Sequence, residues 1–301
     1  MKIVRKTVYH YTSLDVFFKI LDGIKNNQLI FYASRVYELN DSTELLYGLK
    51  KIWKWLPQIE KELSINDDRY KLSKIGTDNE LMSGIFPKII LDGLKKSKIN
   101  TFVISFSNDK DSIPMWNMYG DKGNGVALGF DLQLEFKKDH SEFSDLTNMD
   151  GRPFSFSMSY GNYKPKDAAL RFVKIEYSNY YNKVGGFANI EDIINKQLDL
   201  IDKIAFISAL LLKHSSFSYE RESRLFYNII GNLNDIKFRT NSKGNVIPYV
   251  EAPIPLSLLK KIIVGPCCNA SQVKKTIDLK FQQIGKDNIK IENSKVPYRD
   301  F

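Results

Sequence analysis

Two glutamates one residue apart, Glu220 and Glu222, have the types and spacing best suited to chemistry in this chain. Side chains alternate along a strand, so a strand here would put both carboxylates on one face and Arg221 on the other. Like charges on one face repel and are costly to bury. Such a pair either handles protons and positive charge in a reaction, or forms a buried ion network with Arg224, Arg221 or Lys213. The residues alone leave both interpretations open.

The sequence places a histidine and a threonine at the end of an apolar strand, because residues 8–13 read Val-Tyr-His-Tyr-Thr-Ser. Ser13 or Asp15 is a suitable cap for a helix that ends at Gly23. His10 can hydrogen-bond a hydroxyl group of a ligand, or it can be a core histidine with a protein partner. Both interpretations stay open.

A pair of serines and three aromatic side chains complete the candidate site. Period-two geometry puts the hydroxyls of Ser105 and Ser107 on one face of their strand. There they can hold a carboxylate or a ligand hydroxyl, or simply end the strand. Tyr32, Trp116 and Tyr119 offer flat faces on which a planar ring can stack, with core packing as the alternative.

Helical and strand patterns alternate along the chain, and no linker divides it. We expect helices over about 42–63 (kinked or split at Pro57), 79–96, 190–214 and 270–281. We expect strands over 29–33, 101–107, 126–130, 172–177, 224–230, 246–251, 261–264 and 289–291. Residues 137–165 are rich in Ser, Asp, Gly and Asn, and we predict a flexible loop there. The pattern predicts one α+β domain over 1–301 with a helical insertion at about 42–98.

Composition limits the classes of function. The two cysteines, Cys267 and Cys268, are adjacent and only three histidines occur, so we expect a reduced cytoplasmic protein without a metal. No apolar run is long enough to cross a bilayer and no signal-peptide pattern begins the chain, so we expect no membrane partner. The net charge of +9 favours anionic partners, although AT-rich coding also produces a lysine-rich chain. Glycine-rich nucleotide motifs and the Gly-x-Ser-x-Gly elbow are absent from the sequence.

Several clusters occur in a specific order: Tyr-His-Tyr-Thr at 9–12, Ser-Phe-Ser at 105–107, Pro-Met-Trp-Asn-Met-Tyr-Gly at 114–120 and Tyr-Glu-Arg-Glu-Ser-Arg-Leu at 219–225. Together they resemble the bacterial domain-of-unknown-function family 2971, which is grouped with the ADP-ribosyltransferase superfamily. The likeness covers residues 9–44, 102–130, 213–225 and 262–266. It implies an α+β fold with an ADP-ribosyltransferase-like split β-sheet core and NAD as the substrate.

The resemblance also implies roles for single residues. Glu222, as the second glutamate of the pair, would stabilise the positive charge that builds on the ribose when the bond to nicotinamide breaks. Glu220 would orient the acceptor. The implied NAD-binding residues are His10, Tyr11, Thr12, Tyr32, Ser105, Ser107, Trp116 and Tyr119.

The resulting hypothesis is an NAD-dependent ADP-ribosyltransferase that modifies a nucleic acid (RNA or DNA) or a protein. A toxin or phage-defence effector of this kind would have an antitoxin or other regulatory protein as a partner. The alternatives are an NAD glycohydrolase and an inactive nucleotide- or nucleic-acid-binding module. The hypothesis requires His10, Ser105 and Glu222 to line one cleft, with Tyr32 or Trp116 on its wall. We also expect Glu222→Gln to remove transfer and leave the fold intact.

Overall fold

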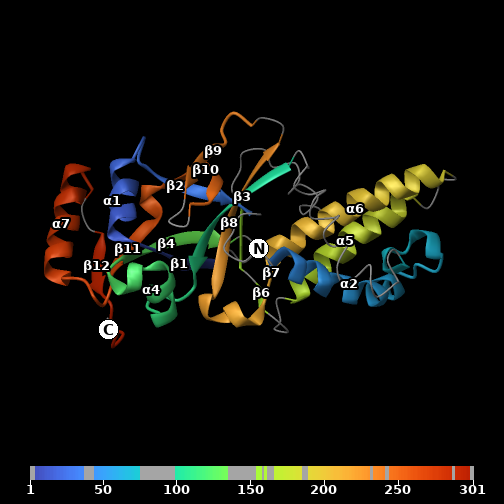
Figure 1. The fold of residues 1–301 in the computed structure, drawn as a ribbon, viewed down its shortest axis with the longest axis horizontal. Coiled ribbons are helices and arrows are strands. Elements are labelled where there is room, and N and C mark those ends of the chain that lie inside the picture. Colours follow the sequence, from blue (N-terminus) through green and yellow to red (C-terminus); the bar gives the residue numbers. More distant parts are fainter. Residues whose placement is uncertain are drawn as a thin grey trace.

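The computed structural model describes residues 4–36, 44–74, 99–134, 154–157, 159–160, 166–184, 189–230, 233–240, 244–286 and 289–298. The molecule is elongated, with a sheet body at one end and an arm of helices at the other (Figure 1). The expected helix over 79–96 lies outside the described residues, as does most of the expected loop over 137–165.

A ten-stranded sheet forms the body. Its strands are β1 Val4–Thr12, β2 Gln28–Arg35, β3 Ile99–Ser107, β4 Val126–Leu134, β5 Phe154–Ser157, β8 Glu222–Ile230, β9 Lys237–Thr240, β10 Val246–Pro255, β11 Leu259–Val264 and β12 Lys290–Asn293. Eight of them follow the order β12-β11-β4-β1-β3-β2-β10-β9, while β8 pairs with β3 and β5 pairs with β8. The pairs are antiparallel except for β11 with β12. Two short strands, β6 Ser159–Tyr160 and β7 Leu212–Lys213, form a separate parallel pair.

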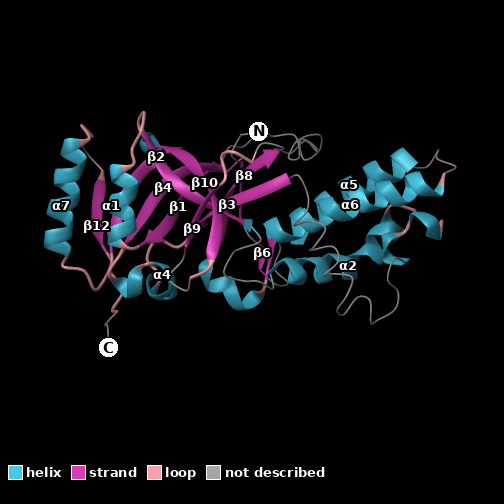
Figure 2. Cartoon of the chain, turned by 45° about the horizontal axis from the view of Figure 1, so that its top comes forward, coloured by secondary structure: helices cyan, strands magenta, loops and turns pink. Residues whose placement is uncertain are grey.

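The helices fall into two groups. Near the sheet lie α1 Leu14–Asp22, α4 Ile113–Tyr119 and α7 Ala270–Gln283, and the arm consists of α2 Glu44–Glu62, α5 Lys166–Val184 and α6 Ile190–Leu211 (Figures 1 and 2). The short 3-10 helices are η2 Asp68–Tyr70, η3 Leu72–Lys74, η5 Asp121–Gly123, η8 Ser215–Glu220 and η9 Leu256–Leu258. Among the described helices, none combines the length and apolar character needed to cross a membrane.

The two ends of the molecule have separate apolar cores. Side chains of β1, β3, β4 and β11 pack with Phe17 of α1 and Phe281 of α7 in the sheet body. The arm core joins residues of α2, α5 and α6, including Ile52 and Tyr177, and reaches Phe226 of β8. Strand β8 therefore connects the sheet body to the arm.

The sheet is split beside β3. One edge of β3 pairs with β8 along its whole length. On the opposite edge Val103 pairs with Ser34 of β2 and Ser107 pairs with Tyr9 of β1. Within these described strands, residues 104–106 have no strand partner on this edge, so β1 and β2 diverge there. At this gap backbone groups of β3 lack a partner among the described strands, and the Ser105 side chain is exposed.

The α+β class is confirmed, and so are the local features around the first helix. Helix α1 begins after Ser13, whose side chain accepts a hydrogen bond from the Val16 amide, and it ends at Gly23. Helix α2 continues through Pro57 as one element, so a complete split at this proline is excluded.

One local prediction is wrong. Residues 172–177 are part of α5 and not a strand. Their aromatic and β-branched side chains suggested a strand, but Ala169, Val173, Tyr177 and Val184 are fully buried at helical spacing and pack in the arm core. Within the range 137–165, where we predicted a loop, the described residues form the short strands β5 and β6, which pair with β8 and β7.

Candidate functional site

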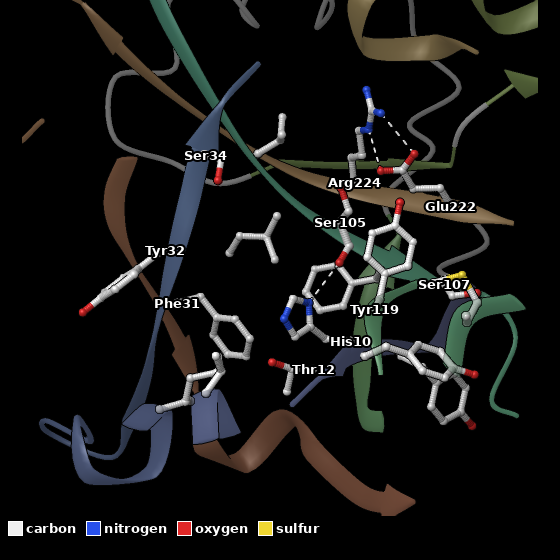
Figure 3. Close-up of a pocket in the computed structure, with 18 of the residues that line it drawn as sticks. His10, Thr12, Phe31, Tyr32, Ser34, Ser105, Ser107, Tyr119, Glu222 and Arg224 are labelled. Atoms are coloured by element: carbon white, nitrogen blue, oxygen red, sulfur yellow. Dashed lines mark hydrogen bonds and ion pairs between the residues drawn. The ribbon is translucent and has the colours of Figure 1, made fainter. Parts of the chain in front are cut away.

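A cavity of about 770 Å³ opens at the split in the sheet. Its lining includes His10 and Thr12 of β1, Ser105 of β3, and Glu222 and Arg224 of β8, together with residues of α1, α4, β2, β7 and β9. Tyr32 and Ser34 lie on one side of the cavity and Glu222 and Arg224 on the other, with His10 between them (Figure 3). The expected convergence of His10, Ser105 and Glu222 on one cavity, with Tyr32 on its wall, is confirmed.

His10 takes the place of a missing strand partner. Its Nδ1 atom lies 3.0 Å from the carbonyl oxygen of Ser105, at the unpaired edge of β3. A carbonyl only accepts, so Nδ1 carries the proton. The ring packs edge-on against Phe31 and Phe106. Burial lowers the pKa of His10, although the bond to Ser105 opposes this in part, and the imidazole is neutral near pH 7. Its Nε2 atom is therefore an acceptor.

The opposite end of the cavity holds a buried group of charges. Arg224 donates from Nε to Oε1 of Glu222 over 2.8 Å and from Nη2 to Oε2 over 3.1 Å. Lys213 Nζ donates to the same Oε2 over 2.9 Å. The Ser105 hydroxyl is a further hydrogen-bond partner of Glu222. All three charged side chains are at most 7% exposed.

Glu220 belongs to the same group. Lys213 Nζ donates to its Oε2 over 2.6 Å, and the Tyr119 hydroxyl donates to its Oε1 over 2.9 Å. Burial and the Glu220 carboxylate raise the pKa of Tyr119, so its hydroxyl keeps the proton that it donates. Two carboxylates and two cations make this group neutral overall. We call Lys213, Glu220, Glu222 and Arg224 the charge cluster.

The two carboxylates converge for a different reason from the one expected. Glu220 ends the 3-10 helix η8, and β8 begins only at Glu222. Between them Arg221 adopts a left-handed conformation with φ of 43° and ψ of 47°. Its side chain points outward and forms an ion pair with Asp109 at 2.7 Å. Strand alternation is therefore the wrong explanation, and Arg221 is not a partner of the carboxylates.

The charge cluster keeps Glu222 ionised. Burial by itself would raise the pKa of this carboxyl, but Arg224 and Lys213, helped by hydrogen bonds from Arg224 and Ser105, lower it from 4.5 to about 2. At neutral pH Glu222 is thus a fixed negative charge and a poor proton acceptor. The buried ion network of the two glutamates with Lys213 and Arg224 is therefore confirmed.

The remaining expected residues divide between the cavity and the core. Thr12 and Tyr11 line the cavity, but the Tyr11 hydroxyl is held by the carbonyl of Asp109 at 2.9 Å. Ser107 also lines it, and its hydroxyl donates to the carbonyl of Glu220 over 2.7 Å. Trp116 is fully buried, donates to Asp111 and is not among the lining residues. It therefore packs in the core, which was the alternative.

Three lining cations, Lys19, Lys25 and Arg239, were not expected. They come from α1, the turn after it and the edge strand β9, so no local spacing connects them. Lys213 and Arg224 were expected only as alternative ion partners of the carboxylates. Among the described residues, no group of histidine, cysteine and carboxylate side chains could hold a metal ion.

Residues 115–225 match the model of a family described as protein of unknown function (DUF2971). The match runs from α4 into β8 and so includes the charge cluster and Tyr119. No curated protein and no solved structure matches the chain. The resemblance to family 2971 is thus supported over this segment, and the comparisons give no support to the link with ADP-ribosyltransferases.

Proposed function

We propose that the cavity binds NAD and that the protein transfers ADP-ribose to a macromolecular acceptor. The observation that carries this proposal is the convergence of His10, Ser105 and Glu222 from three strands on one cavity. The ionised Glu222 adds the charge that such a reaction needs. The cavity volume of about 770 Å³ lies in the range of ligand sites, roughly 300–1,000 Å³.

Transfer of ADP-ribose mainly needs a negative charge held next to the ribose. The C1′–N bond to nicotinamide breaks, its electron pair leaves with the ring, and positive charge builds on the ribose. The pyridinium of NAD is already cationic, so nicotinamide leaves as a neutral molecule without a general acid. A nucleophilic atom of the acceptor then bonds to C1′, and its proton passes to water. A fixed carboxylate beside the ribose lowers the energy of the charged state.

The hydrogen bonds that each carboxylate already accepts indicate different roles for Glu222 and Glu220. A carboxylate offers about four acceptor positions. Those of Glu222 are occupied by Arg224, Lys213 and Ser105, so this residue acts through its charge. Glu220 accepts side-chain hydrogen bonds from Tyr119 and Lys213, and it keeps capacity for a ribose or acceptor hydroxyl. His10 Nε2 can accept from a second hydroxyl or from the carboxamide of nicotinamide.

A binding module without turnover is the second candidate. The observation that favours it is the neutrality of the charge cluster, because Lys213 and Arg224 offset much of the field of the two carboxylates. Hydrolysis of NAD is the variant of the first candidate in which water replaces the acceptor.

One incubation distinguishes these outcomes. NAD labelled in its adenylate half is mixed with the purified protein and a cell lysate, free nicotinamide is measured, and protein, RNA and DNA are separated. Transfer gives nicotinamide and a label attached to one fraction, hydrolysis gives nicotinamide and free ADP-ribose, and a binding module gives neither. An absence of NAD binding by calorimetry contradicts transfer, hydrolysis and any module that binds NAD.

The double variant Lys213→Met with Glu222→Gln tests the role of the Glu222 charge in catalysis. It removes one charge of each sign, so the buried cluster stays neutral and the fold is less perturbed than by Glu222→Gln alone. We expect NAD binding to persist and nicotinamide release to be lost. Full turnover in this double variant would remove Glu222 from the catalytic role.

A further inference from the structure

The end of the cavity opposite the charge cluster has a different chemical character. Strand pairing places Ser34 opposite Tyr249 and Tyr32 opposite Glu251, so these four side chains share one face of β2 and β10. Arg239 of β9 is paired with Ile247 of β10 and lies on the same face. We call this surface, made of Tyr32, Ser34, Tyr249, Arg239 and Glu251, the outer shelf.

An exposed aromatic ring forms the flat part of the outer shelf. Tyr32 is 52% exposed although it lies in the middle of a strand. Its inner side rests on Tyr249, with ring centroids 4.3 Å apart and planes at 34°. Tyr32 points away from His10 (Figure 3). A ring that is supported on one side and open on the other is a surface on which a base can stack.

An exposed guanidinium lies on the same face as this ring. Arg239 Nη2 donates to the Ser34 hydroxyl over 2.9 Å, across the intervening strand β10. Glu251, the carboxylate of the outer shelf, is occupied by Lys237 at 2.6 Å. In the described part of the chain, Arg239 has no carboxylate partner. Its charge and its other donors can therefore serve an anion, and the exposed Lys25 adds a second cation to the same cavity.

We propose that the outer shelf is a nucleotide subsite, in which Tyr32 stacks a base and Arg239 binds the phosphate attached to it. A flat ring with a guanidinium on the same face matches the two parts of a nucleotide. Two sources share this chemistry: the adenylate half of NAD, which rests on the proposed function, and a nucleotide of a single-stranded nucleic acid, which does not. The net charge of +9 is compatible with either source.

The test measures dissociation constants of the full-length protein for adenosine, AMP, NAD and a short single-stranded oligonucleotide. Tyr32→Ala should weaken AMP binding roughly 5- to 150-fold, whereas Tyr32→Phe keeps the ring and should bind like the wild type. Arg239→Gln should weaken AMP and leave adenosine binding unchanged, because adenosine has no phosphate. A thermal melt of each variant checks that it is folded.

Two control variants match these changes. Phe238→Ala removes an exposed aromatic ring next to Arg239 in the sequence, on the opposite face of β9 by strand alternation. Lys275→Gln removes one exposed positive charge on α7. Neither should change AMP binding, so a loss that both controls share with the shelf variants contradicts a specific subsite.

The pattern across the probes identifies the source. Losses for AMP and NAD with unchanged oligonucleotide binding assign the subsite to the dinucleotide, and a loss for the oligonucleotide with unchanged NAD assigns it to a strand. Wild-type affinity for every probe in Tyr32→Ala and Arg239→Gln, or no binding of AMP and oligonucleotide by the wild type, overturns the proposal. Intact AMP binding without nicotinamide release would instead overturn only the proposed transfer.

Discussion

Replacing Glu222 with glutamine should destabilise the fold at neutral pH. The similar size of the two side chains would by itself suggest an intact fold, as the sequence analysis expected. The substitution leaves Lys213 and Arg224 buried with Glu220 as the one carboxylate of the cluster. The folded-state pKa of Glu222 is about 2, against 4.5 for a free carboxyl. At about 1.36 kcal/mol per pH unit, this difference corresponds to about 3 kcal/mol of stability at pH 7.

The sign of the pH dependence follows from the lowered pKa. The contribution is fully present above pH 4.5 and is lost as the pH falls through 2. Urea denaturation of the wild type and of Glu222→Gln at several pH values should give a difference in unfolding free energy of about 3 kcal/mol at pH 7. The difference should fall to less than half by about pH 3.

A control and a second variant make this prediction refutable. Glu62→Gln removes an exposed carboxylate that pairs with Lys174, and its stability should differ little from the wild type at any pH. Lys213→Met with Glu222→Gln should recover part of the loss, because the buried cluster is neutral again. A difference for Glu222→Gln that does not change between pH 7 and pH 3 would refute the assignment of the low pKa.

Three further predictions concern other parts of the molecule. Tyr177→Phe removes the buried hydroxyl that donates to Glu60 Oε1 over 2.7 Å, so unfolding in urea should show a loss of roughly 1–3 kcal/mol, and an unchanged midpoint contradicts the buried bond. Gly125→Ala places a Cβ against the backbone oxygen of Thr12, so the melting temperature should fall by several degrees; a wild-type melt would show that β1 and β4 can separate without cost. Burial lowers the pKa of His10, so the wild type should lose stability relative to His10→Asn as the pH falls below about 6.5. A difference in melting temperature between the two proteins that is the same at pH 7.5 and at pH 5 would contradict a neutral imidazole.

Local sequence signals were sufficient for the elements around the first strand. The Ser13 cap and the helix end at Gly23 depend on residues within one helical turn, and both are where the pattern predicts them. Residues 172–177 show the opposite case, because their strand-like composition is overruled by packing against α2, which is distant in sequence, and against the following helix α6. The local pattern fails there because burial against other helices decides the structure.

The sequence predicted residues that line the candidate site, but not the backbone geometry that brings them together. The ordered clusters identified His10, Ser105 and Glu222, which converge although 95 residues separate the first two. The left-handed turn at Arg221 was not predictable, because this conformation is uncommon for a residue other than glycine. The split at β3, where His10 substitutes for a strand partner, depends on how the two strands β1 and β2 share one edge of β3.

The proposed function puts the nicotinamide-bearing ribose of NAD between His10 and the two carboxylates of the charge cluster. The most direct test is a crystal structure of the wild-type protein with a carbocyclic NAD analogue, whose bond to nicotinamide cannot be cleaved by this chemistry. We predict that a hydroxyl of its nicotinamide-side ring lies within hydrogen-bond distance, about 2.6–3.2 Å, of Glu220, with Glu222 behind it and His10 Nε2 facing the ligand. An analogue bound outside the cavity, or with its nicotinamide at Tyr32 and its adenine at the charge cluster, would contradict this placement of NAD.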